Sequence, residues 1–448
     1  MKRIFYLAAL VISALPLSTF AQAVPDSVLQ QATLDNCIQY ALKNQPVIRQ
    51  SVIDEAIADR TVKSRLSAWY PQIGGAYNLQ HYLQLPVTIL PDFTNPNSDV
   101  RRAVTTGVPN TSSVQFSFSQ NIFNRDVLLA SRTGSLVRLQ SGQVTTSNKI
   151  DLVVNVSKAY YDVLLTQKQV EILNSNIVRL QRSLQDATNQ YKSGIVDKTD
   201  YQRATIALNT TRAQHKQYVE QVGSKYEYLK QLMNYPISQK LPLEFDTLQL
   251  AREVAFDTLQ GLNLENRIEY QQLQTQRQLL QANVRYNRWA YLPSLSAFGN
   301  YNLVFQNTEF TKLYSQRFPN SLIGVTLALP IFQGGRRVQE VRIAELQLQR
   351  SQWDVTALKN GVNSEYAQAL ANYKGNLANL NALQENVELA QDVYRIISLQ
   401  YRSGVKAYLD VVISESDLRA AQLSHLNALY QTLSSKLDVQ RALGTIQF

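Results

Sequence analysis

Two long stretches of this chain contain no proline, and this feature sets the strongest limit on its fold. They are residues 110–235 and 331–448, and all thirteen prolines lie outside them. A proline inside a helix costs about 3 kcal/mol, because it removes a backbone donor and clashes with the preceding turn. Both stretches can therefore form helices far longer than those of an ordinary globular domain.

Each stretch contains a run of residues spaced alternately four and three apart. The first run is Leu173, Ile177, Leu180, Leu184, Ala187 and Tyr191, and the second is Leu383, Val387, Ala390, Tyr394, Ile397 and Tyr401. This 3.5-residue spacing is typical of coiled-coil helices. One shift of 210 residues superimposes the runs and also carries Gly194 onto Gly404 and Asp200 onto Asp410. We therefore predict an internal duplication.

A glycine follows each run and marks the end of a helix. Gly194 and Gly404 suit the left-handed conformation that is common just after a helix. The chain is predicted to turn back at 192–200 and at 402–410, in a tip turn of each copy. The four helices joined by these turns span roughly 125–192, 198–234, 333–402 and 408–444.

The first helix of each copy is unusually long, and the second has a candidate cap. At ~1.5 Å per residue, each first helix extends about 100 Å, which suits a device that bridges a distance. Asp197, Thr199 or Asp200 can cap the second helix of the first copy, and Asp410 stands at the corresponding place in the other copy.

Four short segments alternate apolar and polar residues and are predicted to be strands. They lie at about 71–81, 113–122, 293–304 and 321–331. In one of them, residues 113–119 read Ser-Val-Gln-Phe-Ser-Phe-Ser. About ten residues of period two match a tilted membrane-spanning strand with its apolar side toward lipid and its polar side toward a lumen. The alternative is a small soluble sheet with one face packed on the helices.

Aromatic residues at the boundaries of these segments favour the membrane-spanning alternative. They are Trp69, Tyr70, Phe123, Trp289, Tyr291 and Phe332. Aromatic residues gather at the two interfaces of a membrane barrel. The polar connections within each strand pair, about 83–112 and 306–320, are then predicted to be extracellular loops, of which the first is longer.

Four strands are too few to close a membrane barrel by themselves. The smallest closed barrels have eight strands, and lipid tolerates no open sheet edge. Two copies of the chain supply eight strands and three supply twelve. Eight strands fill their own interior with side chains, whereas twelve leave more room for a passage. A transport function therefore favours three copies.

The N-terminus has the features of a secretory signal peptide. Lys2 and Arg3 precede an apolar run over 4–17, and Ala21 and Ala23 offer cleavage points. This pattern is too short for a membrane-spanning helix and predicts export from the cytoplasm.

The remaining composition offers little to an enzyme or a nucleic-acid-binding protein. The single cysteine, Cys37, cannot form an intrachain disulfide and is predicted to be a small buried residue. The three histidines, His81, His215 and His425, show no metal-ligand spacing. The net charge of +10 is dispersed, without the basic cluster that nucleic acid requires. No catalytic residue, metal, cofactor or nucleic acid is expected, and the dispersed charge suits solubility or anionic lipid headgroups.

The mature chain resembles the TolC family of outer-membrane efflux proteins over essentially its whole length. The most specific markers are the paired Tyr-x-x-Gly-x5-Asp turns at 191–200 and 401–410. Others are Pro71 and Pro293, each after a helix that precedes a strand, and Pro-Ile-Phe-Gln-Gly-Gly at 330–335.

The resemblance implies a mostly helical fold with membrane β-structure. Long antiparallel coiled-coil helices would form a periplasmic tunnel, and four strands per protomer would form a twelve-stranded β-barrel in a homotrimer. The domain organisation is then a signal peptide at 1–21, a first repeat at 22–234, an inter-repeat linker or equatorial region at 235–260, and a second repeat at 261–448.

The resemblance also implies function, partners and location. The protein would be the outer-membrane channel of a tripartite efflux or type I secretion system. It would be a passive gated conduit for small molecules or proteins, would contact outer-membrane lipid and extend into the periplasm. A periplasmic adaptor and an inner-membrane pump would dock on it, and it would catalyse no reaction.

A periplasmic gate where the two tip turns meet is a further implication of the resemblance. Asp200 would accept a hydrogen bond from the Tyr401 hydroxyl, and Thr199 would meet the basic side chain of Lys406. A lysine stands here where the best-known members have arginine, so a bidentate clamp is not available. In a plainer interpretation, Tyr401 is only the last coiled-coil residue and Asp200 only a helix cap.

Ion selectivity is less defined than the gate. Asp410 matches an acidic ring that makes some family members favour cations. A second acidic position, three residues further on, is Ile413 in this chain. One of the two acidic rings is therefore missing, and the resemblance does not carry cation preference over.

A second class of protein stays open at this point, namely a periplasmic coiled-coil structural or adaptor protein with a small β domain. It predicts a single helix pair and no lipid-facing strand face. The lumen-facing Ser, Gln, Asn and Thr of the strands are wet but unselective, so they predict no particular cargo.

Overall fold

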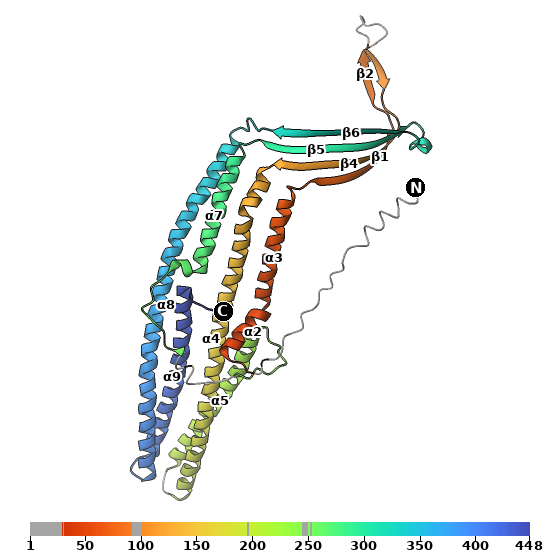
Figure 1. The fold of residues 1–448 in the computed structure, drawn as a ribbon. Coiled ribbons are helices and arrows are strands. Elements are labelled where there is room, and N and C mark those ends of the chain that lie inside the picture. The colour runs from red at the N-terminus through yellow and green to blue at the C-terminus, as the bar shows by residue number, and fades with distance from the viewer. Residues whose placement is uncertain (1–28, 30, 92–100, 195–196, 244–249, 251–252) are drawn as a thin grey trace.

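The computed structural model describes residues 29, 31–91, 101–194, 197–243, 250 and 253–448. The predicted signal peptide, the middle of the first loop and two residues of the first tip turn lie outside the described residues. The long helices run away from one end of a sheet, and the strands of the sheet extend to one side of the helices (Figure 1).

Two pairs of long antiparallel helices make up most of the molecule. α4 (Arg125–Lys192) returns through α5 (Lys198–Met233), and α8 (Arg336–Arg402) returns through α9 (Tyr408–Leu443). α4 and α8 contain 68 and 67 residues, so each is about 100 Å long at ~1.5 Å per residue. The predicted fold class is confirmed. Among the described residues, no helix combines the length and apolarity needed to cross a bilayer.

Shorter helices complete the half of the molecule nearer the sheet. They are α2 (Leu34–Asn44), α3 (Pro46–Ser67) and α7 (Ile268–Trp289), with 3₁₀ turns η1 (Leu264–Asn266) and η2 (Phe310–Lys312). Pro46 separates α2 from α3, because proline suits the first position of a helix but excludes the helical conformation from the residue before it. In Figure 1, α3, α4, α7 and α8 lie side by side, and each joins one strand of the sheet.

α4 is enclosed by other helices, and α8 is not. α4 packs against α3, α5, α7 and α9, whereas α8 packs mainly along α7 and α9. Leu173, Leu180 and Ala187 of the first heptad run are therefore fully or almost fully buried, at 0%, 3% and 0% exposure. The second run is only half-buried. α8 leaves one apolar flank open, made of Leu389, Val393, Ile396 and Leu399.

The main core lies midway along the molecule, where α2 and α9 meet α4. Cys37 is completely buried there, near Tyr40 and Val156, with Leu437 on α9 in the same cluster. Burial raises the pKa of the Cys37 thiol to about 12, which keeps it protonated and unreactive. The prediction of a small buried residue is confirmed.

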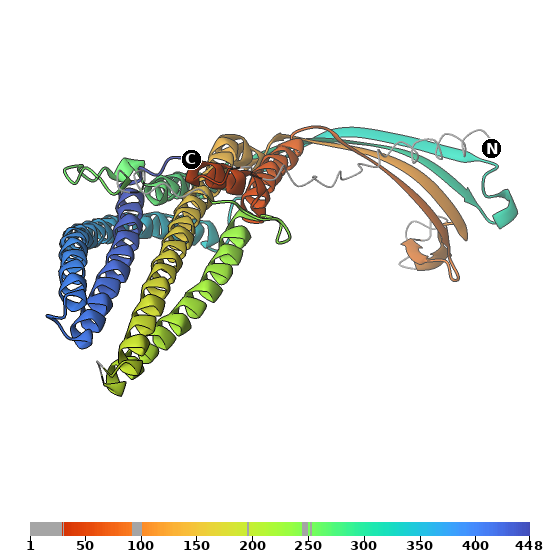
Figure 2. The same cartoon turned by 90° about the horizontal axis from the view of Figure 1, so that it is seen from below.

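The sheet contains the four predicted strands in antiparallel order. They are β1 (Gln72–His81), β4 (Asn110–Phe123), β5 (Ser294–Asn307) and β6 (Arg317–Ala328), and neighbours in this sequence pair with one another. β6 begins four residues earlier than predicted and ends before Pro330, which has no N–H to donate to a ladder. β1 and β6 are edge strands, each with one unpaired side in the protomer. Seen from below, the sheet is strongly curved (Figure 2).

The strand register brings the four alternating patterns into phase. One row of paired residues across the sheet is Ile73, Phe118, Gly299 and Ile323, and another is Tyr77, Val114, Leu303 and Pro319. Rows on the opposite face are Gly74, Ser117, Asn300 and Leu322, and then Ala76, Gln115, Asn302 and Asn320. The sheet therefore has one apolar face and one largely polar face, although no single strand determines this.

The six predicted interface aromatics lie at one end of the sheet, not at both. Trp69 and Tyr70 precede β1, whereas Phe123 ends β4. Because the strands are antiparallel, the start of one strand and the end of the next meet at the same edge, here the edge joined to the helices. Trp289, Tyr291 and Phe332 follow the same rule. The far end has its own aromatics, where the Tyr314 ring packs edge-on against Phe305 at 5.2 Å between centroids.

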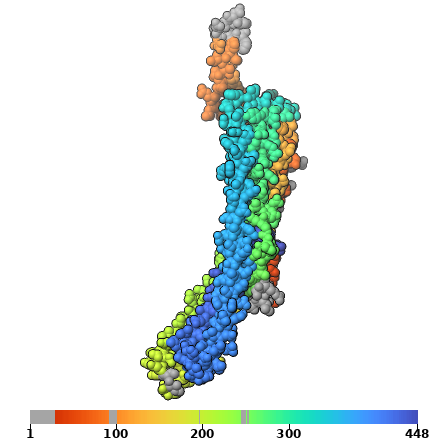
Figure 3. All heavy atoms as spheres, turned by 90° about the vertical axis from the view of Figure 1, so that its left-hand side faces the viewer, coloured from red at the N-terminus to blue at the C-terminus, as the bar shows by residue number. Residues whose placement is uncertain are grey.

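The first loop between strands of the sheet contains an element that the sequence did not predict. β2 (Val87–Pro91) and β3 (Arg101–Thr105) form a separate antiparallel hairpin. It projects beyond the four-stranded sheet (Figures 1 and 3). The hairpin makes the first loop longer than the second, as expected.

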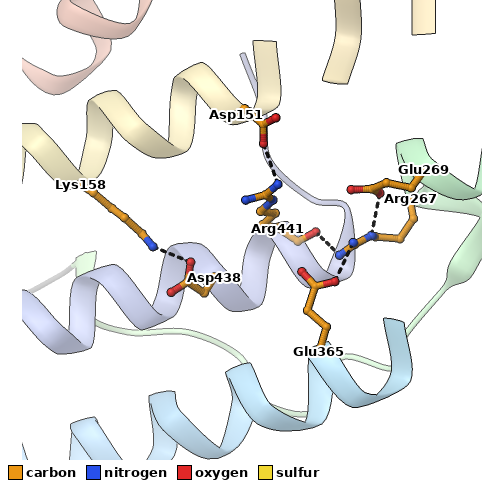
Figure 4. Close-up of polar contacts among 7 residues, drawn as sticks. All are labelled: Asp151, Lys158, Arg267, Glu269, Glu365, Asp438 and Arg441. Atoms are coloured by element: carbon orange, nitrogen blue, oxygen red, sulfur yellow. Dashed lines mark hydrogen bonds and ion pairs between the residues drawn. The ribbon is translucent and has the colours of Figure 1, made fainter. Parts of the chain in front are cut away.

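A polar cluster fastens the end of α9 to the helices nearer the sheet (Figure 4). Arg267, only 4% exposed, lies between η1 and α7 and contacts Glu269 at 3.0 Å and Glu365 of α8 at 2.9 Å. Its Nη1 also donates to the Arg441 carbonyl, 3.0 Å away, in the last turn of α9. Arg441 in turn pairs with Asp151 of α4 at 2.7 Å. The Arg267 guanidinium thus joins α7, α8 and α9, and Arg441 extends the cluster to α4 of the other helix pair.

Candidate functional site

The helix tips farthest from the sheet form the candidate gate. Gly194 and Gly404 have φ values of +71° and +77°, so both adopt the predicted left-handed conformation. The Gly404 N–H donates to the Tyr401 carbonyl at 3.0 Å, and Gly194 donates likewise to Tyr191. The same backbone geometry therefore closes both long helices.

Of the predicted caps after these turns, Asp197 takes the N-cap position of α5, whereas the expected side-chain hydrogen bonds and the cap at Asp410 are wrong. The N-cap residues are Asp197 and Ala407, and neither makes a side-chain cap hydrogen bond. Asp200 and Asp410 lie in the first turns of α5 and α9. Their negative charges interact favourably with the positive end of each helix dipole. This interaction stabilises the helix in a different way from a side-chain cap.

Tyr401 is bonded in the protomer, but not to Asp200 as expected. Its hydroxyl donates to Gln190 Oε1 at 2.8 Å, and its ring packs at 5.7 Å from that of Tyr408. Tyr408 is 1% exposed and accepts a hydrogen bond from Ser183. Desolvation raises the pKa of Tyr401, and the nearby charge of Asp200 adds to that rise. The longer Gln190 amide on α4 reaches the hydroxyl, while Asp200 stays close enough to act through its charge.

Lys406 also has a different partner within the protomer. Its Nζ lies 3.8 Å from Asp410 Oδ2, one helical turn away, instead of meeting Thr199. Both side chains are about 40% exposed, so the pair contributes well under 1 kcal/mol. The gate roles of Thr199, Asp200, Lys406 and Asp410 remain predictions about the assembled channel.

A buried carboxylate farther up α9 escaped the sequence analysis. Glu415 continues the spacing of Val411 and Leu418 along the helix seam, and its side chain is only 6% exposed. Arg179 of α4 lies 3.3 Å away. Asn176 beside it is 1% exposed, and among the described residues its amide has no hydrogen-bond partner. A charged residue at a heptad position was the signal that could have revealed the site.

Glu415 predicts a pH dependence of helix packing. Desolvation raises its pKa above the ordinary value of 4.5, and the attraction of Arg179 only partly offsets this. A carboxyl with a raised pKa in the folded state stabilises the fold below the unfolded pKa and loses that contribution as pH rises through the raised value.

Glu415→Gln should therefore unfold at a temperature equal to or above that of the wild type at pH 7.5, with a flatter pH profile. Thermal melts from pH 4 to 8 measure this. The exposed Glu220→Gln is the control, and a lower melting temperature of Glu415→Gln at pH 7.5 contradicts the prediction.

Comparison with known proteins agrees with this architecture. The chain matches the family model described as "Outer membrane efflux protein" over residues 37–235 and 259–445. Outer membrane protein TolC of Vibrio cholerae is 22% identical over 412 residues, covering 91% of this chain and 89% of that one. The probable efflux pump outer membrane protein TtgC of Pseudomonas putida is 25% identical, covering 82% and 78%.

Solved structures show the same fold. The crystal structure of CusC superposes with a TM-score of 0.73 at 18% identity and covers 95% of both chains. The chain has two helix pairs and a sheet with one apolar face. These features exclude the alternative considered above, a periplasmic coiled-coil structural or adaptor protein with a single helix pair. With a family match on both halves, the chain belongs to the outer membrane efflux protein family, whose channels lie in the outer membrane and extend into the periplasm.

Proposed function

We propose that three copies of the chain close into one gated export channel. The observation that carries this is the four-stranded sheet with two free edges, β1 and β6, and an apolar face. Unpaired backbone groups cannot face lipid, so these edges must pair with other copies. β1 and β6 run in opposite directions, and β6 of one copy can therefore join β1 of the next in an antiparallel ring. Three copies give twelve strands, which leave room for a passage.

The helices support the same assembly. α8 forms one flank of the protomer and exposes Leu389 and Leu399, each more than half exposed. α5 on the other flank exposes Ile206 at 65%. A monomeric protein rarely leaves such apolar rows in water, so contact between neighbouring copies explains them.

The proposed channel is a passive conduit. Ser117, Asn300 and Asn302 on the polar face would line the barrel, and they offer water-like hydrogen bonding without a site for chemistry. An adaptor protein and an inner-membrane pump would dock at the helix tips and supply the cargo, either small molecules or proteins. TtgC, by its name the outer-membrane component of a probable efflux pump, supports this tripartite arrangement.

The assembly is tested by mass and by conductance. The mature protein, extracted in detergent, should have the native mass of three chains and should form discrete channels in planar bilayers. Cys37 is buried, so spurious disulfides will not create oligomers. A native mass of one or two chains would contradict the proposal, and so would a three-chain assembly that shows no conductance.

The gate predicts an effect of Tyr401 on channel opening. Tyr401→Phe removes the hydroxyl that Gln190 binds and that Asp200 approaches, so it should favour the open state. The lost hydrogen bond to the neutral Gln190 amide is worth about 0.5–1.5 kcal/mol, a factor of roughly 2 to 13 in the open–closed equilibrium. Single-channel recording measures it. Tyr191→Phe, at the equivalent position of the first copy, is the matched control, and Asp200→Ala tests the carboxylate. Wild-type currents in both Tyr401→Phe and Asp200→Ala would contradict the proposal that these residues form the gate.

A further inference from the structure

A small polar cavity lies where the sheet joins the helices. Its volume is about 250 Å³, and it is lined by the starts of α4 and α8, the end of α7 and the bases of β5 and β6. Its charged lining consists of Arg125, Arg336, Arg337, Asp126 and Glu340, with Trp289 beside them. The cavity is far from the candidate gate, and the channel function uses none of these side chains.

Two of the arginines are held in place by aromatic rings and backbone carbonyls. Arg337 is 9% exposed, lies 4.8 Å over the Tyr291 ring and donates to the Ile331 carbonyl at 3.0 Å and to Ala290. Arg125 lies 4.5 Å over the ring of Tyr286. These contacts fix both guanidinium groups without cancelling their charge.

The cavity carries a net charge of one positive unit. Three arginines face two carboxylates, of which Glu340 lies 3.6 Å from Arg336 and Asp126 accepts a hydrogen bond from Tyr286 at 2.6 Å. The N-terminus of α8 adds positive potential from its helix dipole, and the first turn of α8 contains Arg336 and Arg337 but no acidic residue to offset it. Cations at the positive end of a helix dipole are unfavourable, and an anion in the cavity relieves that repulsion.

The cavity also lies at the level of a membrane interface. Ile331 and Phe332, which join β6 to α8, are both 86% exposed, and Tyr291 is nearby. Exposed aromatics of this kind mark the headgroup layer of a bilayer. Ser294 and Ala328, at the base of the sheet on its polar side, also line the cavity, so anions in solution can reach it from the lumen side.

We propose that this junction cavity binds a phosphate group that carries one negative charge. Arginine matches phosphate in geometry, because its planar fork donates two parallel hydrogen bonds. The phosphate comes either from an anionic phospholipid headgroup of the periplasmic leaflet or from phosphate in solution, and both sources present the same oxygens. Basic pockets beside membrane spans bind lipid headgroups by this chemistry.

Trp289 provides an internal reporter for the test. The chain has three tryptophans, so Trp69→Phe with Trp353→Phe leaves Trp289 as the only one. In one arm, inorganic phosphate is titrated into the detergent-solubilised channel. In the other, the channel is placed in nanodiscs of phosphatidylcholine with and without phosphatidylglycerol. Native mass spectrometry of the protein without tryptophan substitutions counts retained phosphatidylglycerol independently.

Arg125→Gln with Arg336→Gln should weaken the response by roughly tenfold or more, since hydrogen bonds to charged groups are lost. Lys216→Gln with Arg395→Gln, which removes the same charge from exposed pairs elsewhere, should leave it unchanged. Arg125→Lys with Arg336→Lys retains the charge and should recover part of it. A response to phosphate alone assigns the solution source, and one to phosphatidylglycerol alone assigns the lipid. If neither ligand distinguishes the wild type from the glutamine variant, the proposal is overturned.

Discussion

Arginine in place of Ile323 is expected to prevent the protein from inserting into the outer membrane, whereas arginine in place of the adjacent Leu322 is expected to be tolerated. Ile323 is 86% exposed and pairs across the sheet with Gly299 on the apolar face. An arginine on the lipid face near the middle of a bilayer costs about 2–4 kcal/mol in membrane barrels. In the proposed ring of three copies, that cost applies three times.

Leu322 is the matched control because it differs from Ile323 only in the face that it occupies. It pairs with Asn300, which pairs with Ser117, so an arginine there enters the polar face. The measurement is the amount of folded trimer in outer-membrane fractions, compared at equal expression. Equal losses in Ile323→Arg and Leu322→Arg would contradict the assignment of the two faces, and a loss in Leu322→Arg alone would reverse it.

The regular elements were predictable because each has its own period. The 3.5-residue runs and the absence of proline defined α4 and α8, and Gly194 and Gly404 defined where they end. The period of two defined the four strands. The shared register of the strands was not predictable in this way, because it depends on how neighbouring strands pair and not on any one segment.

The contacts of the gate were only partly predictable. Gln190 belongs to the repeated sequence around Tyr191, so the sequence already identifies it as a residue of the tip region. Whether the Tyr401 hydroxyl meets Gln190 or Asp200 depends on the distance between two helix pairs, which no periodicity encodes. The β2–β3 hairpin was missed for another reason, since each strand has only five residues and Pro91 at the end of β2 is a common turn residue.

The largest expected loss of helix stability follows from removing Arg267. Its guanidinium joins Glu269, Glu365 and the Arg441 carbonyl, and the arginine is 4% exposed (Figure 4). Breaking a buried ion pair costs 3–5 kcal/mol. The two glutamates are 35% and 45% exposed and regain water, so Arg267→Ala should cost about 3 kcal/mol, the low end of that range.

Arg441 in the same cluster provides the control. It pairs with Asp151 at 2.7 Å, but both side chains are more than 40% exposed. A pair of this kind contributes about 0–1 kcal/mol, so Arg441→Ala should have little effect. Hydrogen exchange in the last two turns of α9 distinguishes the two variants. Arg267→Ala should accelerate exchange there by roughly 100-fold, as about 3 kcal/mol of local opening implies.

Gly444 provides a second route to the same contact. It has a φ of +70°, and a Cβ atom there would lie 2.6 Å from the Asn266 carbonyl oxygen, next to Arg267. Gly444→Ala should therefore loosen the end of α9 as Arg267→Ala does, although it removes no charge. α9 runs from the tip turn to this cluster at its C-terminal end. Faster exchange confined to that C-terminal end, together with wild-type conductance, would show that the attachment of α9 is independent of gating. Exchange in both variants no faster than in Arg441→Ala would mean that apolar packing of α9, and not this cluster, holds the end of α9 in place.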